Sequence, residues 1–164
     1  MSDIEAAAAA VADELAIDLP HLQPPGEVRF DPATLAVVVG LWLLQNVADG
    51  IAEAIKEESK TGTQTVLQRI GTAIGRRVRR DVPKAMASPS GDAELDEAVS
   101  AAESAWTETD SILAQESEMT ADDIAWTASD SVSAALVEAG LPAASAERVR
   151  AALRAEILRL LDER

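Results

Sequence analysis

Apolar residues recur every three or four positions along most of the chain, which is the spacing of one face of an α-helix. The stripe in the second quarter of the chain consists of Leu44, Val47, Ile51 and Ile55. Similar stripes fill residues 66–78, 95–113, 124–136 and 149–161. No segment alternates apolar and polar residues as a half-buried strand does. The pattern predicts an all-α protein, a bundle of about six helices.

Capping residues and prolines predict where the first two helices begin and end. A first helix opens at Ser2 and runs to about Ile17, because Ser2 and Glu5 have the spacing of a capping box. A Pro-rich linker follows. Asp31 is a good N-cap for a second helix that begins at Pro32 and runs to about Lys60.

The later helices carry similar signals. Thr61 and Gln64 form a second capping box that begins a third helix, and Pro83 ends that helix because proline cannot donate to the helical ladder. Asp92 caps a fourth helix. A fifth begins at Thr120, with Asp123 three residues on, and ends at Gly140. The sixth follows Ser145.

Residues 83–91, rich in Pro, Ser and Gly, form the best internal linker. Its position coincides with a change in the sign of the charge. Because 164 residues are typical of one compact domain, we interpret residues 1–164 as a single helical domain. The alternative is two small lobes joined at 83–91, an apolar and basic lobe at 1–82 and an acidic lobe at 92–164.

Charge is segregated along the chain as well as unbalanced. The net charge is −15, and residues 91–140 carry 13 acidic side chains with no Lys or Arg. A basic patch lies just before them, made of Arg69, Arg76, Arg77, Arg79, Arg80 and Lys84. Adaptation to high salt would explain the total charge but not this segregation. Opposed patches favour docking within one subunit or between copies.

The acidic segment contains an internal repeat. Residues 105–112 recur 20 positions later at 125–132, with the shared pattern A-W-T-x-[T/S]-D-S-[I/V]. On one unbroken helix the two copies would face opposite ways, since 20 residues rotate a side chain by ~200° beyond whole turns. We therefore expect a break between Glu116 and Thr120 and a hairpin in which a local twofold relates the copies.

The repeated Trp and Asp side chains have two interpretations. In the first, Trp106 and Trp126 are packing anchors, and the Asp-Ser pairs that begin at Asp110 and Asp130 are solvated. In the second, the repeat is a duplicated contact element, because tryptophan is enriched at binding hot spots.

The Asp-Ser pairs also resemble the Asp-Ser-Leu site at which acyl and peptidyl carrier proteins receive phosphopantetheine. Asp130-Ser131-Val132 is the closer of the two. The resemblance covers about ten residues, lacks the usual preceding glycine, and places the serines inside predicted helices. We therefore expect no cofactor.

Catalytic and metal-binding patterns are missing from the sequence. There is no cysteine, and the one histidine, His21, lies in the Pro-rich linker far from any candidate nucleophile. No Glu-x-x-His pair is present, and Asp122-Asp123 lacks the third carboxylate of a magnesium motif. We expect a protein that is not an enzyme and binds no metal. The acidic balance also argues against nucleic acid as a partner.

The most apolar segment is Leu35–Leu44, which is too short for a membrane span of ~20 residues and is more typical of a buried helix. Residues 70–80 join apolar side chains to a dense cationic end, which would suit anionic lipid. Residues 33–80 could therefore contact a membrane. The N-terminus has acids where a secretory signal has bases, so we expect a cytoplasmic protein.

These patterns favour a non-enzymatic, acidic helical interaction or assembly protein. In the leading hypothesis its basic patch at 69–84 docks an acidic helical face at 91–138, within or between subunits. The partner is the chain itself, as a homo-oligomer, or a basic protein. The candidate interaction residues are Arg76, Arg77, Arg79, Arg80, Trp106, Asp110, Trp126 and Asp130. The alternatives are a membrane-active protein using residues 33–80 and an acidic, immunity-type inhibitor of a basic partner.

Overall fold

The structure is a computed structural model that describes residues 3–15, 32–56, 66–87, 92–114 and 120–162. Six helices account for nearly all of these residues, so the predicted all-α fold is confirmed. They are α1 (Asp3–Leu15), α2 (Pro32–Lys56), α3 (Val66–Ala87), α4 (Asp92–Leu113), α5 (Ala121–Glu138) and α6 (Ala143–Asp162).

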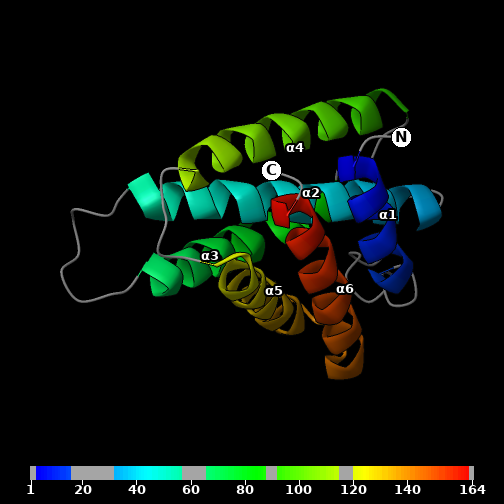
Figure 1. The fold of residues 1–164 in the computed structure, drawn as a ribbon. Coiled ribbons are helices and arrows are strands. Elements are labelled where there is room, and N and C mark those ends of the chain that lie inside the picture. Colours follow the sequence, from blue (N-terminus) through cyan, green and yellow to red (C-terminus); the bar gives the residue numbers. More distant parts are fainter. Residues whose placement is uncertain (1–2, 16–31, 57–65, 88–91, 115–119, 163–164) are drawn as a thin grey trace.

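The longest helix, α2, packs against α1, α3 and α4 (Figure 1). Five of the helices form a closed ring in which each packs against the next, in the order α1, α2, α3, α5 and α6, and α6 returns to α1. α4 lies outside this ring, along α2. The pairs α2 with α4, α3 with α5 and α1 with α6 each join the two halves of the chain that residues 83–91 separate. The packing therefore interleaves those halves.

The core includes most of the predicted apolar stripes together with residues of α1 and of the first half of α2. In α2, Leu44, Val47 and Ile51 are fully buried. The same holds for the stripe residues Ile70, Ile74, Val78, Ala102, Ala128, Val132, Ala135, Leu136, Val149, Leu153 and Ile157. The partly buried members of the predicted stripes include Ile55, Val66, Leu67, Val99 and Leu160. With so few aromatic residues, this core is built by close packing of aliphatic side chains and alanine.

Glycines allow three of the helix pairs to approach closely. A Cβ built on Gly40 would lie 2.8 Å from the Ala8 carbonyl oxygen of α1. A Cβ on Gly50 would lie 2.5 Å from Ile74 Cγ1 of α3. One on Gly71 would lie 3.0 Å from Ser131 Oγ of α5. These glycines therefore mark the α1–α2, α2–α3 and α3–α5 crossings.

Three of the predicted helix boundaries are confirmed, the first being the start of α2 at Pro32. Thr120 Oγ1 accepts a hydrogen bond from the Asp123 backbone N–H at 3.1 Å and caps α5. α5 ends just before Gly140, whose φ of 116° lies in the left-handed region that favours glycine. The predicted capping residues Ser2, Asp31, Thr61 and Gln64 lie outside the described residues.

Two other boundaries were wrong. α3 does not end at Pro83 but continues to Ala87. The proline removes one backbone donor, and the residues after it, Ala85, Met86 and Ala87, are strong helix formers. The last helix begins at Ala143, so Ser145 is a helical residue. Its buried hydroxyl accepts a hydrogen bond from Arg148.

Candidate interaction surfaces

The basic patch predicted at 69–84 is divided among several neighbours. Arg69 is buried, with its Nε 3.4 Å from the Ala54 carbonyl oxygen of α2. Arg76 and Arg77 both pair with Glu53 of α2, at 3.2 and 3.0 Å. The patch therefore meets acidic residues of α2, which sequence reasoning did not select as its partners.

Contact between this patch and the predicted acidic face is provided by Arg79. Its Nη1 lies 3.3 Å from Glu138 Oε2 on α5, and both side chains are about half exposed. Arg80 is exposed. The side chain of Lys84 lies outside the described residues. Thus Arg76 and Arg77 pair with α2, Arg79 pairs with α5, and Arg80 is exposed.

Three helices contribute charged residues to a groove beside the patch. It has a volume of about 380 Å³ and is lined by Asp49, Ala52, Glu53, Lys56, Arg77 and Glu108. Lys56 Nζ lies 2.7 Å from Glu108 Oε1 and ties α4 to α2. Burial raises the pKa of the Asp49 carboxyl above its ordinary value. Glu108 and Glu53 act in the same direction, and Arg77 and Gln45 oppose them.

Asp49→Asn is expected to stabilise the protein at neutral pH. The raised pKa means that the folded state binds the Asp49 proton more tightly than the unfolded state, so the contribution of this carboxyl to stability falls as pH rises through that pKa. Asparagine removes this partly buried charge. We expect a gain of less than about 1 kcal/mol, since the side chain is partly solvated. Thermal unfolding at pH 7 and at lower pH measures it.

The gain should shrink as pH falls, because wild-type Asp49 is then protonated too. Glu103→Gln is the matched control, since Glu103 is an exposed acid on the outer side of α4 and its replacement should change stability by no more than ~0.5 kcal/mol. A pH-independent effect of Asp49→Asn would contradict the assignment.

The two copies of the repeat have different surroundings. A break between the two copies is confirmed, as α4 ends at Leu113 and α5 begins at Ala121, whereas its predicted start at Glu116 lies outside the described residues. The predicted hairpin is wrong for the described residues, because α4 packs on α2 whereas α5 packs on α3 and α6. The repeats therefore do not face each other across a local twofold.

The two copies of the repeat bury the same polar position but differ in the exposure of their tryptophan. Thr109 and Ser129 are both buried; Thr109 donates to the Ala48 carbonyl oxygen of α2 at 2.8 Å, and Ser129 donates to Ala125 of its own helix at 2.7 Å. Trp106 is 4% exposed and Trp126 is 50% exposed. The first tryptophan is a packing anchor, and the second is a surface residue.

Trp126 is surrounded by charges of both signs from α5 and α6. The guanidinium carbons of Arg150 and Arg154 lie 5.3 and 5.0 Å from the centre of its ring, within cation–π range. Arg154 Nη2 lies 3.0 Å from Asp122 Oδ1, and Arg150 Nη1 lies 4.0 Å from Asp130 Oδ1. We call these five residues the Trp126 face.

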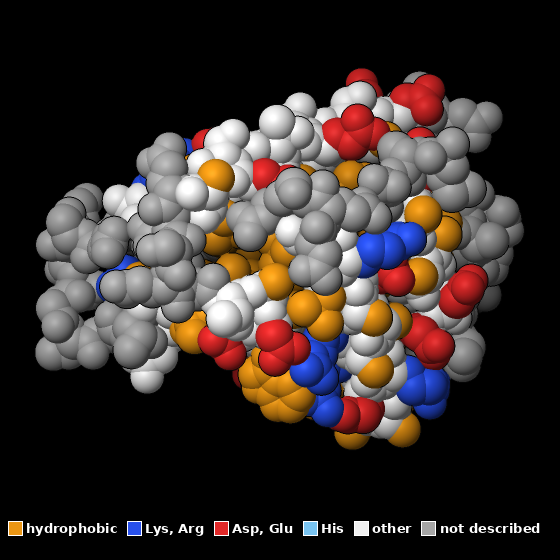
Figure 2. Space-filling model, viewed as in Figure 1, with side chains coloured by type: hydrophobic (Ala, Val, Ile, Leu, Met, Phe, Trp, Pro, Cys, Tyr) orange, Lys and Arg blue, Asp and Glu red, His pale blue; other side chains and the backbone are white. Residues whose placement is uncertain are grey.

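The Trp126 face continues along α5 toward its C-terminus. Val137 is 44% exposed, and with Trp126 it makes up the large exposed apolar residues of the described part of the chain. The two are 11 positions apart, three helical turns, so they project from the same side of α5. Figure 2 shows apolar side chains beside blue and red charged groups over the lower part of α5 and α6.

Sequence reasoning selected Trp126 and Asp130 but missed Arg150 and Arg154. The available signal was their spacing of four residues on a helix that follows α5 after a short turn, which makes α6 its antiparallel neighbour. Trp106 and Asp110 lie on α4, away from this face, and Asp110 is partly buried. The eight candidate residues therefore do not form one site.

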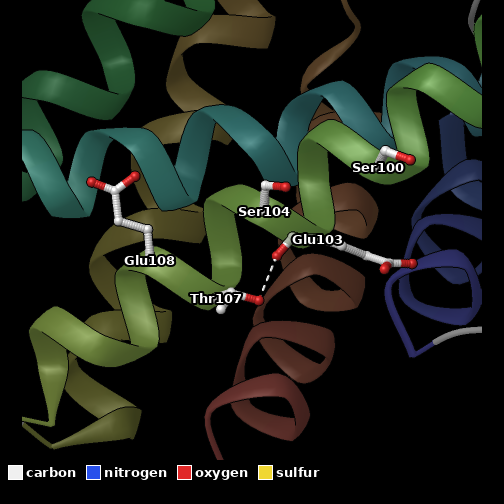
Figure 3. Close-up of a pocket in the computed structure, with 5 residues that line it drawn as sticks. All are labelled: Ser100, Glu103, Ser104, Thr107 and Glu108. Carbon is white, nitrogen blue, oxygen red and sulfur yellow. Dashed lines mark hydrogen bonds between the residues drawn. The ribbon is translucent and has the colours of Figure 1, made fainter.

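Other pockets on the surface are lined by fewer charged side chains. One of about 490 Å³ is lined, as far as the structure describes, by a single helix, with Ser100, Glu103, Ser104, Thr107 and Glu108 all on α4 (Figure 3). The Thr107 hydroxyl donates to the Glu103 carbonyl oxygen at 2.9 Å. Another of about 580 Å³ lies between α3 and α5 beside Gly71 and Asp130. Within the described ranges, no three His, Asp or Glu residues are grouped to hold a metal ion.

Comparison of the chain with protein-family models, curated proteins and solved structures gives no match. Its function is therefore argued from its own surfaces.

Proposed function

We propose that this chain is a non-enzymatic, all-α interaction protein that assembles with its own copies through the Trp126 face. The half-exposed Trp126, held beside two arginines, is the observation that carries the proposal. Tryptophan and arginine are the residues most enriched at binding hot spots, where a large ring and a planar cation lose water together. Trp106, at the equivalent position of the first copy of the repeat, is buried in the core. Of the two repeated tryptophans, Trp126 is therefore the one exposed for binding a second subunit.

The electrostatic setting supports self-association at this face. A chain of net charge −15 repels copies of itself over most of its surface. On the Trp126 face the acid Asp122 is paired with Arg154, and Arg150 is shared between Asp130 and Glu147 of its own helix. Two copies can approach there with less repulsion than across α4, which carries seven acids and no Lys or Arg. The arginines at 76–79 are engaged with α2 and α5 and leave the Trp126 face as the better docking surface.

Trp126→Ala is expected to weaken self-association at least ~10-fold, since the ring is the largest side chain of the face. Size-exclusion chromatography with light scattering, at ~0.1 M and at several molar KCl, measures it. Glu103→Gln on α4 is the control. An assembly that Trp126→Ala leaves intact would refute the proposed surface.

A membrane-active role is the second candidate, favoured by one observation. Residues Ala36–Lys56 of α2 are long and apolar enough to cross a membrane by length and composition. In the bundle, 67% of that window is buried, as in the core helix of a soluble protein. Flotation of the full chain with anionic liposomes tests this candidate, and the chain should stay at the bottom of the gradient if α2 serves only as core.

A further inference from the structure

We infer that two copies pair about a twofold axis parallel to α5 and α6, so that α5 of each copy lies over α6 of the other. The inference rests on the proposed function and specifies its geometry. It follows from the order of charges on the Trp126 face.

The face consists of one acidic row and one basic row. On α5, Asp122, Trp126 and Asp130 are spaced four residues apart and therefore lie on one side of the helix. On α6, Arg150 and Arg154 form the adjacent row. Their contacts set the register, since Arg154 lies beside Asp122 and Arg150 beside Asp130. The basic row thus runs alongside the acidic row, with the tryptophan between the two pairs.

Two identical faces of this kind can be stacked by a twofold axis in either of two directions. An axis perpendicular to the helices places α5 over α5, so that Asp122 of one copy meets Asp130 of the other and the arginines meet arginines. An axis parallel to the helices places α5 over α6, so that Asp122 meets Arg154 and Asp130 meets Arg150 of the second copy. Like charges in contact oppose association, and opposite charges favour it. The parallel axis is therefore selected.

The apolar residues fit the same arrangement. With the parallel axis, each Trp126 ring lies against the stems of Arg150 and Arg154 in the second copy, and arginine stems cover apolar surface well. Val137, three turns along α5, extends the contact toward the turn at residues 139–142. Each arginine then has an aspartate in its own copy and another in the second copy, and Arg150 also retains its pair with Glu147 of its own helix.

The size of the face predicts a weak dimer. Helices of 18 and 20 residues are about 27 and 30 Å long. With their axes ~9 Å apart, α5 and α6 form a face of roughly 500 Å² on each copy. A standard protein–protein interface buries ~800 Å² per partner. We therefore expect a dissociation constant of about 10 μM or weaker, and the experiments should reach ~1 mM protein.

A full charge swap tests the pairing. The swapped variant carries Asp122→Arg, Asp130→Arg, Arg150→Asp and Arg154→Asp, which retains opposite charges within each subunit and in the parallel-axis homodimer. In a mixed dimer of wild type and swapped variant, each row would face a row of its own sign. Because the chain has no cysteine, Ser104→Cys on the outer side of α4 provides one labelling position for energy transfer between copies.

We expect energy transfer in wild-type mixtures and in swapped-variant mixtures, and at least ~10-fold less association between wild type and swapped variant. Equal transfer in all three mixtures would overturn the pairing. If Trp126→Ala abolishes wild-type association while wild type and swapped variant still mix, the proposed face stands and this geometry fails. Wild-type protein that stays monomeric at ~1 mM would overturn both.

Cross-linking provides a second measurement if circular dichroism shows that the swapped variant does not fold. Asp130→Cys and Arg150→Cys proteins are mixed and oxidised, and the parallel axis predicts a disulfide between them. The perpendicular axis predicts one between Asp122→Cys and Asp130→Cys proteins. Efficient formation of the second disulfide without the first would contradict the inference.

Discussion

Trp106→Ala is expected to cost about 3–5 kcal/mol of folding free energy, the range for truncating a buried aromatic residue. Trp106 is 4% exposed, and it anchors α4, which lies outside the ring of the other five helices and packs mainly on α2. Removing the ring leaves a cavity between α4 and α2, where α4 makes most of its contacts. Because small domains have a stability of ~5–15 kcal/mol, the loss would be a large part of the total.

The repeat supplies a matched control for this substitution. Trp126→Ala removes the same side chain from the equivalent position of the second copy, where the ring is 50% exposed, and should cost less than ~1 kcal/mol. Urea unfolding followed by circular dichroism compares the two. Equal losses would contradict the division into an anchor and a surface residue.

Trp106→Phe adds a finer comparison. The indole Nε1 of Trp106 is buried and has no hydrogen-bond partner among the described residues. A buried donor without a partner costs ~1–3 kcal/mol, so phenylalanine removes that penalty while it retains part of the ring. We expect its loss of stability to be well below that of alanine.

Gly50→Ala is expected to destabilise the protein by about 1–3 kcal/mol, although alanine is the better helix former. The new Cβ would lie 2.5 Å from Ile74 Cγ1 and 3.1 Å from the Ile74 backbone nitrogen. Backbone atoms cannot rotate away, so α2 and α3 must separate along a buried crossing. Thermal and urea unfolding measure the loss.

Gly75→Ala is the control for Gly50→Ala. A Cβ on Gly75 would meet, nearest of all, the guanidinium of Arg79 at 3.3 Å, the flexible end of a side chain. Alanine there should be neutral or stabilising by up to ~1 kcal/mol. If both substitutions have the same effect, the close approach at Gly50 does not limit the packing.

The helices were predictable because their signals are local. The stripe from Leu44 to Ile51 and the Thr120 cap depend on residues a few positions apart, and the structure confirms both. Pro83 shows the limit of such signals. The rule that proline ends a helix was outweighed by the helix formers that follow it, and α3 continues to Ala87.

The surfaces were less predictable because they depend on which helices pack together. Trp106 and Trp126 have nearly the same local sequence, yet α4 packs on α2, and α5 packs on α3 and α6. The partners of Trp126, Arg150 and Arg154, lie more than 20 residues away in the chain. Arg76 and Arg77 likewise pair with Glu53 of α2, not with the acidic segment that sequence charge favoured.

The most direct test of the account is whether Trp126 itself becomes covered when copies associate. The chain has three tryptophans, Trp42, Trp106 and Trp126, so its NMR spectrum has three indole N–H signals that single Trp→Phe variants assign. As the protein concentration rises through the association, covering of the ring by the second copy should shift the Trp126 signal while the Trp106 signal stays in place. A doubled mass by light scattering with an unchanged Trp126 signal would contradict it.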